Sequence, residues 1–224
     1  MKKILILATI VALAILTTNY GYSQPSQPTN GSIYNPDGIE MVYVEGAGSD
    51  MPGFYIGKYE VTQQQWEAVM GSNPSEFKGA NRPVESVSWN DAQTFISKLN
   101  SMTGRTYRLP TEKEWVYAAG EGNRNSTYEY SGSNNIDAVA WYIDNSGSQT
   151  HNVGTKSANV LGIYDMSGNV VEWCEDRFDD SQQYRVVRGG SWFNFASFCS
   201  VSFCDGGTHR YRFNSVGFRL VLVP

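Results

Sequence analysis

The sequence predicts a loop-rich α+β domain, on two features of its composition and one of its patterning. The 224 residues are enough for one domain with a substantial core. An apolar fraction of 41% with 17% charged residues is typical of globular proteins and excludes extended disorder. The 22 glycines and 14 tyrosines, with few segments of helical periodicity, favour α+β over a helical bundle.

The N-terminus predicts a secretory signal peptide over residues 1–23. Lys2 and Lys3 precede an apolar run over residues 4–16, and small residues follow it. A membrane span needs about 20 apolar residues, so we expect no integral span in the mature chain. We therefore expect the protein to be secreted, periplasmic or at the cell surface. No cysteine lies near the cleavage region, which disfavours a bacterial lipoprotein anchor.

The remaining chain divides into a flexible linker over residues 24–37, rich in Pro, Ser, Asn and Gly, and one domain over 38–224. Short apolar runs at 41–44 and 54–56, flanked by Gly, predict an opening hairpin. Residues 123–148 are polar and Gly-rich, and we expect a long surface excursion there, pinned by Trp141 and Tyr142.

Three helices are expected. The first is capped by Thr62 and ends at Met70. The second is capped by Asn90 and stops at Gly104, with apolar residues at helical spacing between them. The third begins at Thr111, where Glu114 completes a capping box, and Gly120 follows its end.

Net charge and cysteine content narrow the possible functions. The formal charge is −5, or −7 once the signal is removed, which excludes an electrostatic footprint for nucleic acid or anionic lipid. Metal cations and neutral or polar partners remain open. Two of Cys174, Cys199 and Cys204 can pair in an oxidising compartment. There is no C-x-x-C spacing for zinc and no nucleophile elbow for a serine hydrolase.

The segment between Phe193 and Ser215 is the most informative part of the chain. It is enclosed by two apolar ends with Gly and Arg, at residues 185–192 and 216–221, which we expect to be scaffold strands. Its interior is rich in aromatic, hydroxyl and amide side chains, the composition of binding loops. We expect Phe193 and Phe195 to form an exposed contact patch. We expect Phe203 in the core instead, on the same face of a strand as Cys199.

Two further groups of residues leave alternatives open. Asp165 and Glu172 flank a Gly turn and could bind Ca²⁺ through hard oxygens, but on sequence alone a capped turn is favoured. Most arginines beside Trp, Tyr and Gly are expected to lock loops through acids. We assign that structural role to Arg108, Arg188 and Arg219, and expect that Arg210 and Arg212 could contact a ligand.

Five motifs in order resemble the formylglycine-generating enzyme (sulfatase-modifying factor) family. They are Phe54-Tyr-Ile-Gly-Lys-Tyr-Glu-Val-Thr62, Pro83-Val-Glu-Ser-Val-Ser-Trp89-Asn-Asp-Ala92, Arg108-Leu-Pro-Thr-Glu-Lys-Glu-Trp115-Val-Tyr-Ala-Ala119, Gly162-Ile-Tyr-Asp-Met-Ser-Gly-Asn-Val-Val-Glu-Trp173, and Arg188-Gly-Gly-Ser-Trp192 with Gly217-Phe-Arg219. The resemblance implies an α+β, C-type-lectin-like fold with little regular secondary structure. It also implies a Ca²⁺ site at Asp165, Gly168, Val170 and Glu172, of which Gly168 and Val170 would bind through their carbonyls. The resemblance therefore favours a metal site at these residues over a bare turn. A second family calcium site is expected around residues 141–151, without an assigned ligand set.

The resemblance does not carry the family's catalysis to this chain. Oxidising members bind copper through two cysteines, and the matching positions here are Asn194 and Cys199. Cu(I) prefers paired soft thiolates, and an amide does not replace one. Cys199 could instead pair with Cys174. The sequence therefore argues against a sulfatase-activating oxidase.

A non-catalytic branch of the same fold is the better match. The Arg188-Gly-Gly-Ser-Trp192 and Gly217-Phe-Arg219 motifs, which enclose the segment, resemble those of ligand-binding variable proteins diversified by retroelements. This resemblance implies a receptor-like protein whose C-terminal surface binds a protein or glycan ligand, with calcium stabilising the scaffold. The positions implied are Phe193, Asn194, Phe195, Phe198, Ser200, Phe203, Asp205, Tyr211, Phe213, Asn214 and Ser215. The alternatives are an oxidase with altered chemistry, such as a non-haem iron enzyme, and a structural part of a surface or secretion apparatus.

Overall fold

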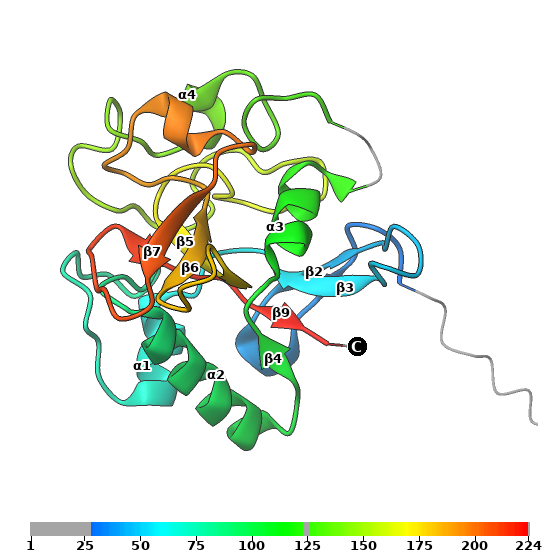
Figure 1. Ribbon diagram of the computed structural model, residues 1–224, viewed down its shortest axis with the longest axis vertical. Helices are drawn as coiled ribbons and strands as arrows, with labels where there is room; N and C mark the ends of the chain where they lie inside the picture. The colour runs from blue at the N-terminus through cyan, green and yellow to red at the C-terminus, as the bar shows by residue number, and fades with distance from the viewer. Residues whose placement is uncertain (1–27, 123–125, 224) are drawn as a thin grey trace, which may run out of the picture.

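A computed structural model describes residues 28–122 and 126–223, which form two β-sheets with helices around them (Figure 1). The predicted signal peptide, residues 1–23, lies outside the described residues. The first sheet is antiparallel and includes the hairpin that the sequence predicts. Across the sheet its strands are β1 (Ile33–Tyr34), β2 (Met41–Val44), β3 (Phe54–Gly57), β9 (Val221–Leu222) and β4 (Tyr107–Arg108).

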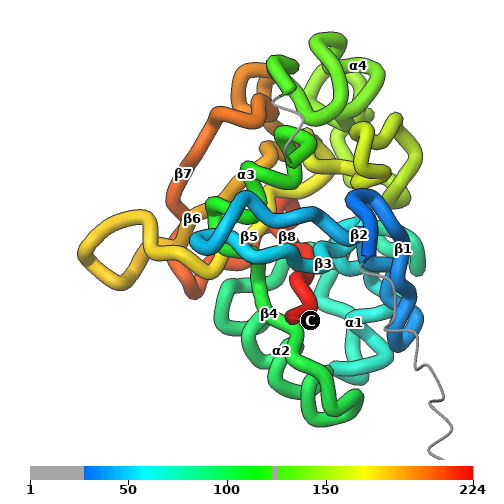
Figure 2. The backbone as a smooth tube through the Cα atoms, turned by 90° about the vertical axis from the view of Figure 1, so that its right-hand side faces the viewer, coloured from blue at the N-terminus to red at the C-terminus, as the bar shows by residue number. Residues whose placement is uncertain are grey.

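The second sheet carries the C-terminal segment. Across it the strands are β7 (Asp205–Thr208), β6 (Tyr184–Arg188), β5 (Val171–Arg177) and β8 (Val216–Gly217). Strands β5 and β8 are parallel, and the other pairs are antiparallel. The β5–β6 hairpin projects from the body of the molecule, as Figure 2 shows. The expected scaffold strands at both ends of the segment are therefore present.

The three expected helices form with the caps that their sequences encode. They are α1 (Gln63–Met70), α2 (Trp89–Thr103) and α3 (Glu112–Ala119). Capping boxes begin all three, through Thr62, Ser88 and Thr111. The cap of α2 was predicted two residues too late, because Ser88 and Asp91 form the reciprocal bonds. Helix α4 (Ile136–Val139), capped by Asn135, interrupts the expected surface excursion.

Helix α3 joins the two sheets. Its Trp115 and Ala118 pack in one cluster with Val42 and Ile56 of the first sheet and Val186 of the second. A second cluster lies where α1 and α2 meet both sheets, and there Trp66 stacks on Phe95 at 5.3 Å between ring centroids. No helix within the described ranges has both the length and the apolar character needed to cross a membrane.

The segment expected to be a flexible linker enters the fold at its C-terminal end. Strand β1 pairs with β2, and the 3-10 helix η1 (Pro36–Gly38) follows it. The carboxylate of Asp37 accepts hydrogen bonds from Arg105 Nε (3.0 Å) and the Tyr107 hydroxyl (2.9 Å). The sequence did not predict this contact, because the segment is polar overall and the bonds that connect it to β4 depend on one carboxylate, that of Asp37.

Candidate binding face

Two glycines with positive φ turn the chain from β6 into the segment 193–215. Gly189 and Gly190 have φ of 94° and 69°, in the region that favours glycine. A Cβ on Gly190 would lie 2.7 Å from Cys199 Sγ, so the turn also needs the absence of a side chain. The 3-10 helix η3 (Ala196–Cys199), strand β7 and a final loop follow before β8. We call the surface of residues 193–215 the C-terminal face.

Four aromatic side chains of this face are exposed. Their exposed fractions are 62% for Phe193, 63% for Phe195, 55% for Tyr211 and 54% for Phe213. Phe193 and Phe195 are the residues that we expected in an exposed patch. Large apolar side chains gathered on one surface are a mark of interaction sites.

A cavity of about 210 Å³ opens within this face. The second sheet supplies its apolar lining, which includes Val171, Trp173, Val187 and Val216. Two edge-to-face aromatic pairs line the cavity as well. Phe198 and Phe203, which precede β7, lie 4.8 Å apart between ring centroids. Tyr211 and Phe213, in the loop between β7 and β8, lie 5.5 Å apart. The expected strand through Phe203 is wrong, because a 3-10 helix and a turn occupy residues 196–202 and leave this ring half-buried at the cavity.

Most polar side chains predicted for ligand contact are bonded within the protein. Asn194 Oδ1 accepts from Ser191 Oγ (2.6 Å), and Asn214 Nδ2 donates to Glu76 (2.7 Å). The Ser200 side chain is buried and donates to the Ser197 carbonyl. Asp205 is exposed, and its Oδ1 accepts from the Gly206 N–H. These residues shape the loops, while Ser215 lines the cavity.

The arginines with an expected structural role lock the scaffold. Arg108 forms two 2.6 Å hydrogen bonds with Glu114 at the start of α3. Arg188 pairs with Glu112 and donates to the carbonyls of Val201 and Phe203, which fixes the loop after η3. Its Nε is buried without a partner among the described residues.

The two arginines expected at the ligand differ in their surroundings. Arg212 forms a two-bond pair with Asp91 (2.7 and 2.8 Å), so its guanidinium is held against the start of α2. Arg210 is exposed and donates to His209 Nε2. Arg212 therefore fixes the final loop.

All three cysteines are free, so the expected pairing of Cys174 with Cys199 is absent. Cys174 and Cys199 are buried, and Cys204 donates a hydrogen bond to Glu112. Burial raises the pKa of the Cys199 thiol to about 12. A thiolate is therefore disfavoured at Cys199, the residue that matches a copper-binding cysteine of oxidising family members.

The residues of the expected calcium site lie around a buried acidic cluster. Asp165 Oδ2 accepts from the Gly154 N–H (2.7 Å), and its buried Oδ1 has no partner in the described part of the chain. Burial raises the pKa of Asp165 to about 6. Glu172 is also fully buried, but its two oxygens accept three hydrogen bonds, from Arg219 and Trp115. Asp165 thus keeps one buried oxygen without a partner, whereas both oxygens of Glu172 are committed to Arg219 and Trp115.

Sequence reasoning missed Glu60, a third carboxylate of this cluster. Glu60 is buried and accepts hydrogen bonds from Asn169 Nδ2 (2.6 Å) and the Val170 N–H (3.0 Å). Burial and the neighbouring charge of Asp165 raise its pKa well above the usual range. Its place in the Tyr-Glu-Val-Thr motif, beside the cap of α1, was the available signal. Gly168, with φ of 81°, lies against the backbone of Trp141.

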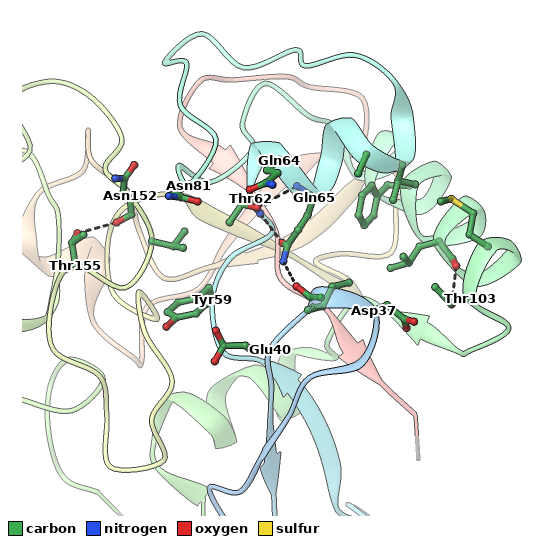
Figure 3. Close-up of a pocket in the computed structure, with 18 residues that line it drawn as sticks. Asp37, Glu40, Tyr59, Thr62, Gln64, Gln65, Asn81, Thr103, Asn152 and Thr155 are labelled. Atoms are coloured by element: carbon green, nitrogen blue, oxygen red, sulfur yellow. Dashed lines mark hydrogen bonds between the residues drawn. The ribbon is translucent and has the colours of Figure 1, made fainter.

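A larger cavity of about 810 Å³ lies away from the C-terminal face, between α1, α2 and the segment around η1 (Figure 3). Its acids, Asp37 and Glu40, are paired with Arg105 and Lys58. Gln65 donates from its side chain to the Gly38 carbonyl across the cavity wall. Those side chains therefore connect elements of the scaffold.

Comparison with known proteins places this geometry in a family. The model of the sulfatase-modifying factor enzyme 1-like domain matches residues 37–223. "Chaperone protein LppX" of Paenibacillus barcinonensis is 36% identical, over 91% of this chain and 92% of its own. The "inactive C-alpha-formylglycine-generating enzyme 2" of Bos taurus is 33% identical over 69% of this chain, which spans about half (54%) of that relative.

A solved structure supports the same assignment. "Treponema denticola variable protein 1" superimposes with a TM-score of 0.79 at 30% identity, covering 86% of this chain and 99% of that one. The loop-rich α+β fold of the formylglycine-generating enzyme kind, which the five motifs implied, is thereby confirmed.

Proposed function

Because the chain belongs to the sulfatase-modifying factor enzyme 1-like family, we propose that it is a non-catalytic member that binds a ligand through its C-terminal face. The observation that carries this proposal is the surface around the 210 Å³ cavity, with four aromatic side chains more than half exposed. Aromatic side chains, Phe and Tyr included, are enriched in protein interfaces.

The two residues that match the family's copper-binding cysteines support ligand binding over an oxidase activity. Asn194 replaces one sulfur ligand, and its carbonyl oxygen already accepts from Ser191. Cys199, at the other position, is buried with a raised pKa. Copper(I) would need both sites as thiolates.

The relatives support the proposal in two ways. One is called a variable protein and matches this chain over almost its full length, which favours a surface built to tolerate side-chain changes. Another is called a chaperone, which favours a protein client over a small substrate. We place the protein outside the cytoplasm on the strength of residues 1–23, and a role as part of a surface apparatus is the alternative for the same location.

Calcium belongs to the proposal as a structural ion. The support is the family resemblance, the unpaired Asp165 Oδ1 and three buried carboxylates that face a single Arg219. Hard oxygen donors of this kind suit calcium. The hydrogen bonds that Arg219 makes to Glu172 compete with that role, so a measurement with and without the ion decides it.

The proposal is tested on the purified mature domain with two probes, a displayed library of linear peptides and an array of glycans. We expect ligands from either probe to lose binding when Phe193 and Phe195 are both changed to Ala. Tyr128→Ala is the matched control, since Tyr128 is 47% exposed and lies outside the C-terminal face. A hit that binds the double variant as well as the wild type contradicts the proposal. So does conversion of a sulfatase-type cysteine peptide to an aldehyde.

A further inference from the structure

Resting on the proposed function, we infer that the ligand is a protein that inserts one large apolar side chain into the cavity of the C-terminal face. The inference depends on three properties of that cavity: its size, the state of its polar side chains, and the aromatic pairs that line it.

The size matches a side chain better than a whole small ligand. The cavity holds about 210 Å³. Pockets that enclose drug-sized ligands and cofactors measure roughly 300–1,000 Å³. A Leu, Met or Phe side chain from a partner would occupy the observed volume, while the partner's backbone remained outside it.

The polar side chains of the cavity offer little to a glycan. The Nη2 of Arg188 donates to Glu112, and its Nη1 donates to the backbone carbonyls of Val201 and Phe203. Asn194 and Asp205 are engaged with Ser191 Oγ and the Gly206 N–H. Among the described lining side chains, the hydroxyls of Ser215 and Tyr211 make no such bond, and the buried Nε of Arg188 has no partner. Recognition of a sugar requires several convergent hydrogen-bonding groups, because each polar group that loses water without gaining a partner weakens binding.

The lining side chains instead suit an apolar anchor. Trp173 and three valines supply the apolar surface of the sheet, and each of the two loops adds an aromatic pair. Phe193 and Phe195 lie on either side of the lining residue Asn194 in the sequence, and both are more than 60% exposed. An anchor pocket surrounded by aromatic side chains that exclude water is the usual arrangement of an interaction hot spot.

The experiment uses variants that fill the cavity and leave the exposed aromatic side chains intact. Peptides are selected from the displayed library against the wild-type mature domain, and their affinities are measured for Ser215→Phe and Val171→Phe. Both residues line the cavity and are half-buried, so two independent substitutions guard against one that fails to fold. Far-ultraviolet circular dichroism and the melting temperature confirm folding, and Tyr128→Ala is again the control.

We expect selected peptides to share one large apolar residue and to bind either filled variant roughly tenfold more weakly or worse. Replacing that residue with Ala in the peptide should cause a similar loss. Ligands found only on the glycan array, peptides without a shared apolar residue, or peptides that bind the filled variants normally overturn the inference. In those cases the proposed function is still tested separately, by whether the ligand loses binding to the variant in which Phe193 and Phe195 are changed to Ala. Failure to select any peptide also contradicts the inference, since the library contains apolar residues in every context.

Discussion

Arg219 and Glu172 form a two-bond ion pair in the centre of the molecule, with Nε–Oε2 at 2.7 Å and Nη2–Oε1 at 2.6 Å. Neither side chain is exposed to solvent. Arg219 also donates to the Gly57 carbonyl of β3, while Glu172 belongs to β5. One side-chain pair therefore ties the first sheet to the second.

Loss of this pair should be costly. We expect Arg219→Met to lower the free energy of unfolding by about 3–5 kcal/mol, because it leaves Glu172 charged and buried without its partner. Urea denaturation followed by tryptophan fluorescence measures the change. Arg212→Met is the control, since its pair with Asp91 is largely exposed and should be worth less than about 1 kcal/mol. Equal losses in the two variants would show that Arg219 does not connect the sheets as described.

Gly190→Ala should destabilise the protein more than the same change at Gly147. Both glycines have positive φ, 69° and 61°, so each substitution carries a backbone cost of about 1–2 kcal/mol. Only at Gly190 would the new Cβ also press on Cys199 Sγ and the Phe198 carbonyl, at 2.7 and 2.8 Å. A Cβ on Gly147 has no atom within 4 Å. The comparison is made by thermal unfolding, and similar melting temperatures would contradict tight packing under η3.

Calcium should raise the melting temperature of the mature domain relative to the same protein in EDTA. The expected cause is neutralisation of the buried cluster of Glu60, Asp165 and Glu172. Asp165→Asn should remove most of the difference while the protein stays folded. Magnesium serves as the control ion, because it demands a more regular and smaller site. An unchanged melting temperature in calcium would leave Arg219 as the only cation of the cluster.

Acid should weaken the start of α3 through Glu114. Burial by itself raises the pKa of this carboxyl, but hydrogen bonds from Arg108 and Thr111 outweigh burial and the net pKa is lowered. A lowered folded-state pKa contributes stability above the unfolded value of about 4.3, and this stability is lost as pH falls through the folded value. We expect Glu114→Gln to be less stable at pH 7 and to show a shallower loss between about pH 5 and 3. Stability curves by urea at each pH provide the check, and parallel curves for the two proteins would refute the assignment.

The sequence predicted those features that depend on local chemistry. The cap at Thr62, the capping box at Thr111, the opening hairpin and the structural role of Arg108 are read from neighbouring residues, and all are present. What it failed to predict depends on contacts between distant segments. The carboxylate of Asp37 holds a Pro- and Gly-rich segment to Arg105, and no local pattern contains that bond.

The C-terminal face shows the same limit. Exposure of Phe193 and Phe195 was predicted from their irregular, small-residue surroundings, and it is observed. The role of Asn214 depends on Glu76, which is 138 residues away, so sequence alone left it as a ligand candidate. The 3-10 helix around Phe198 was missed because alternation of apolar residues there resembles a strand.

Both ends of the C-terminal face are held at the same residue of β5. Glu172 is in register with Arg188 on one side and Gly217 on the other, so the chain leaves and returns across a single strand width. Closing such a loop costs little more when it is lengthened, since the entropy cost grows only with the logarithm of its length. The segment between Arg188 and Gly217 can therefore be exchanged as one unit. Transplanting it from a relative should transfer specificity without redesign of the recipient framework.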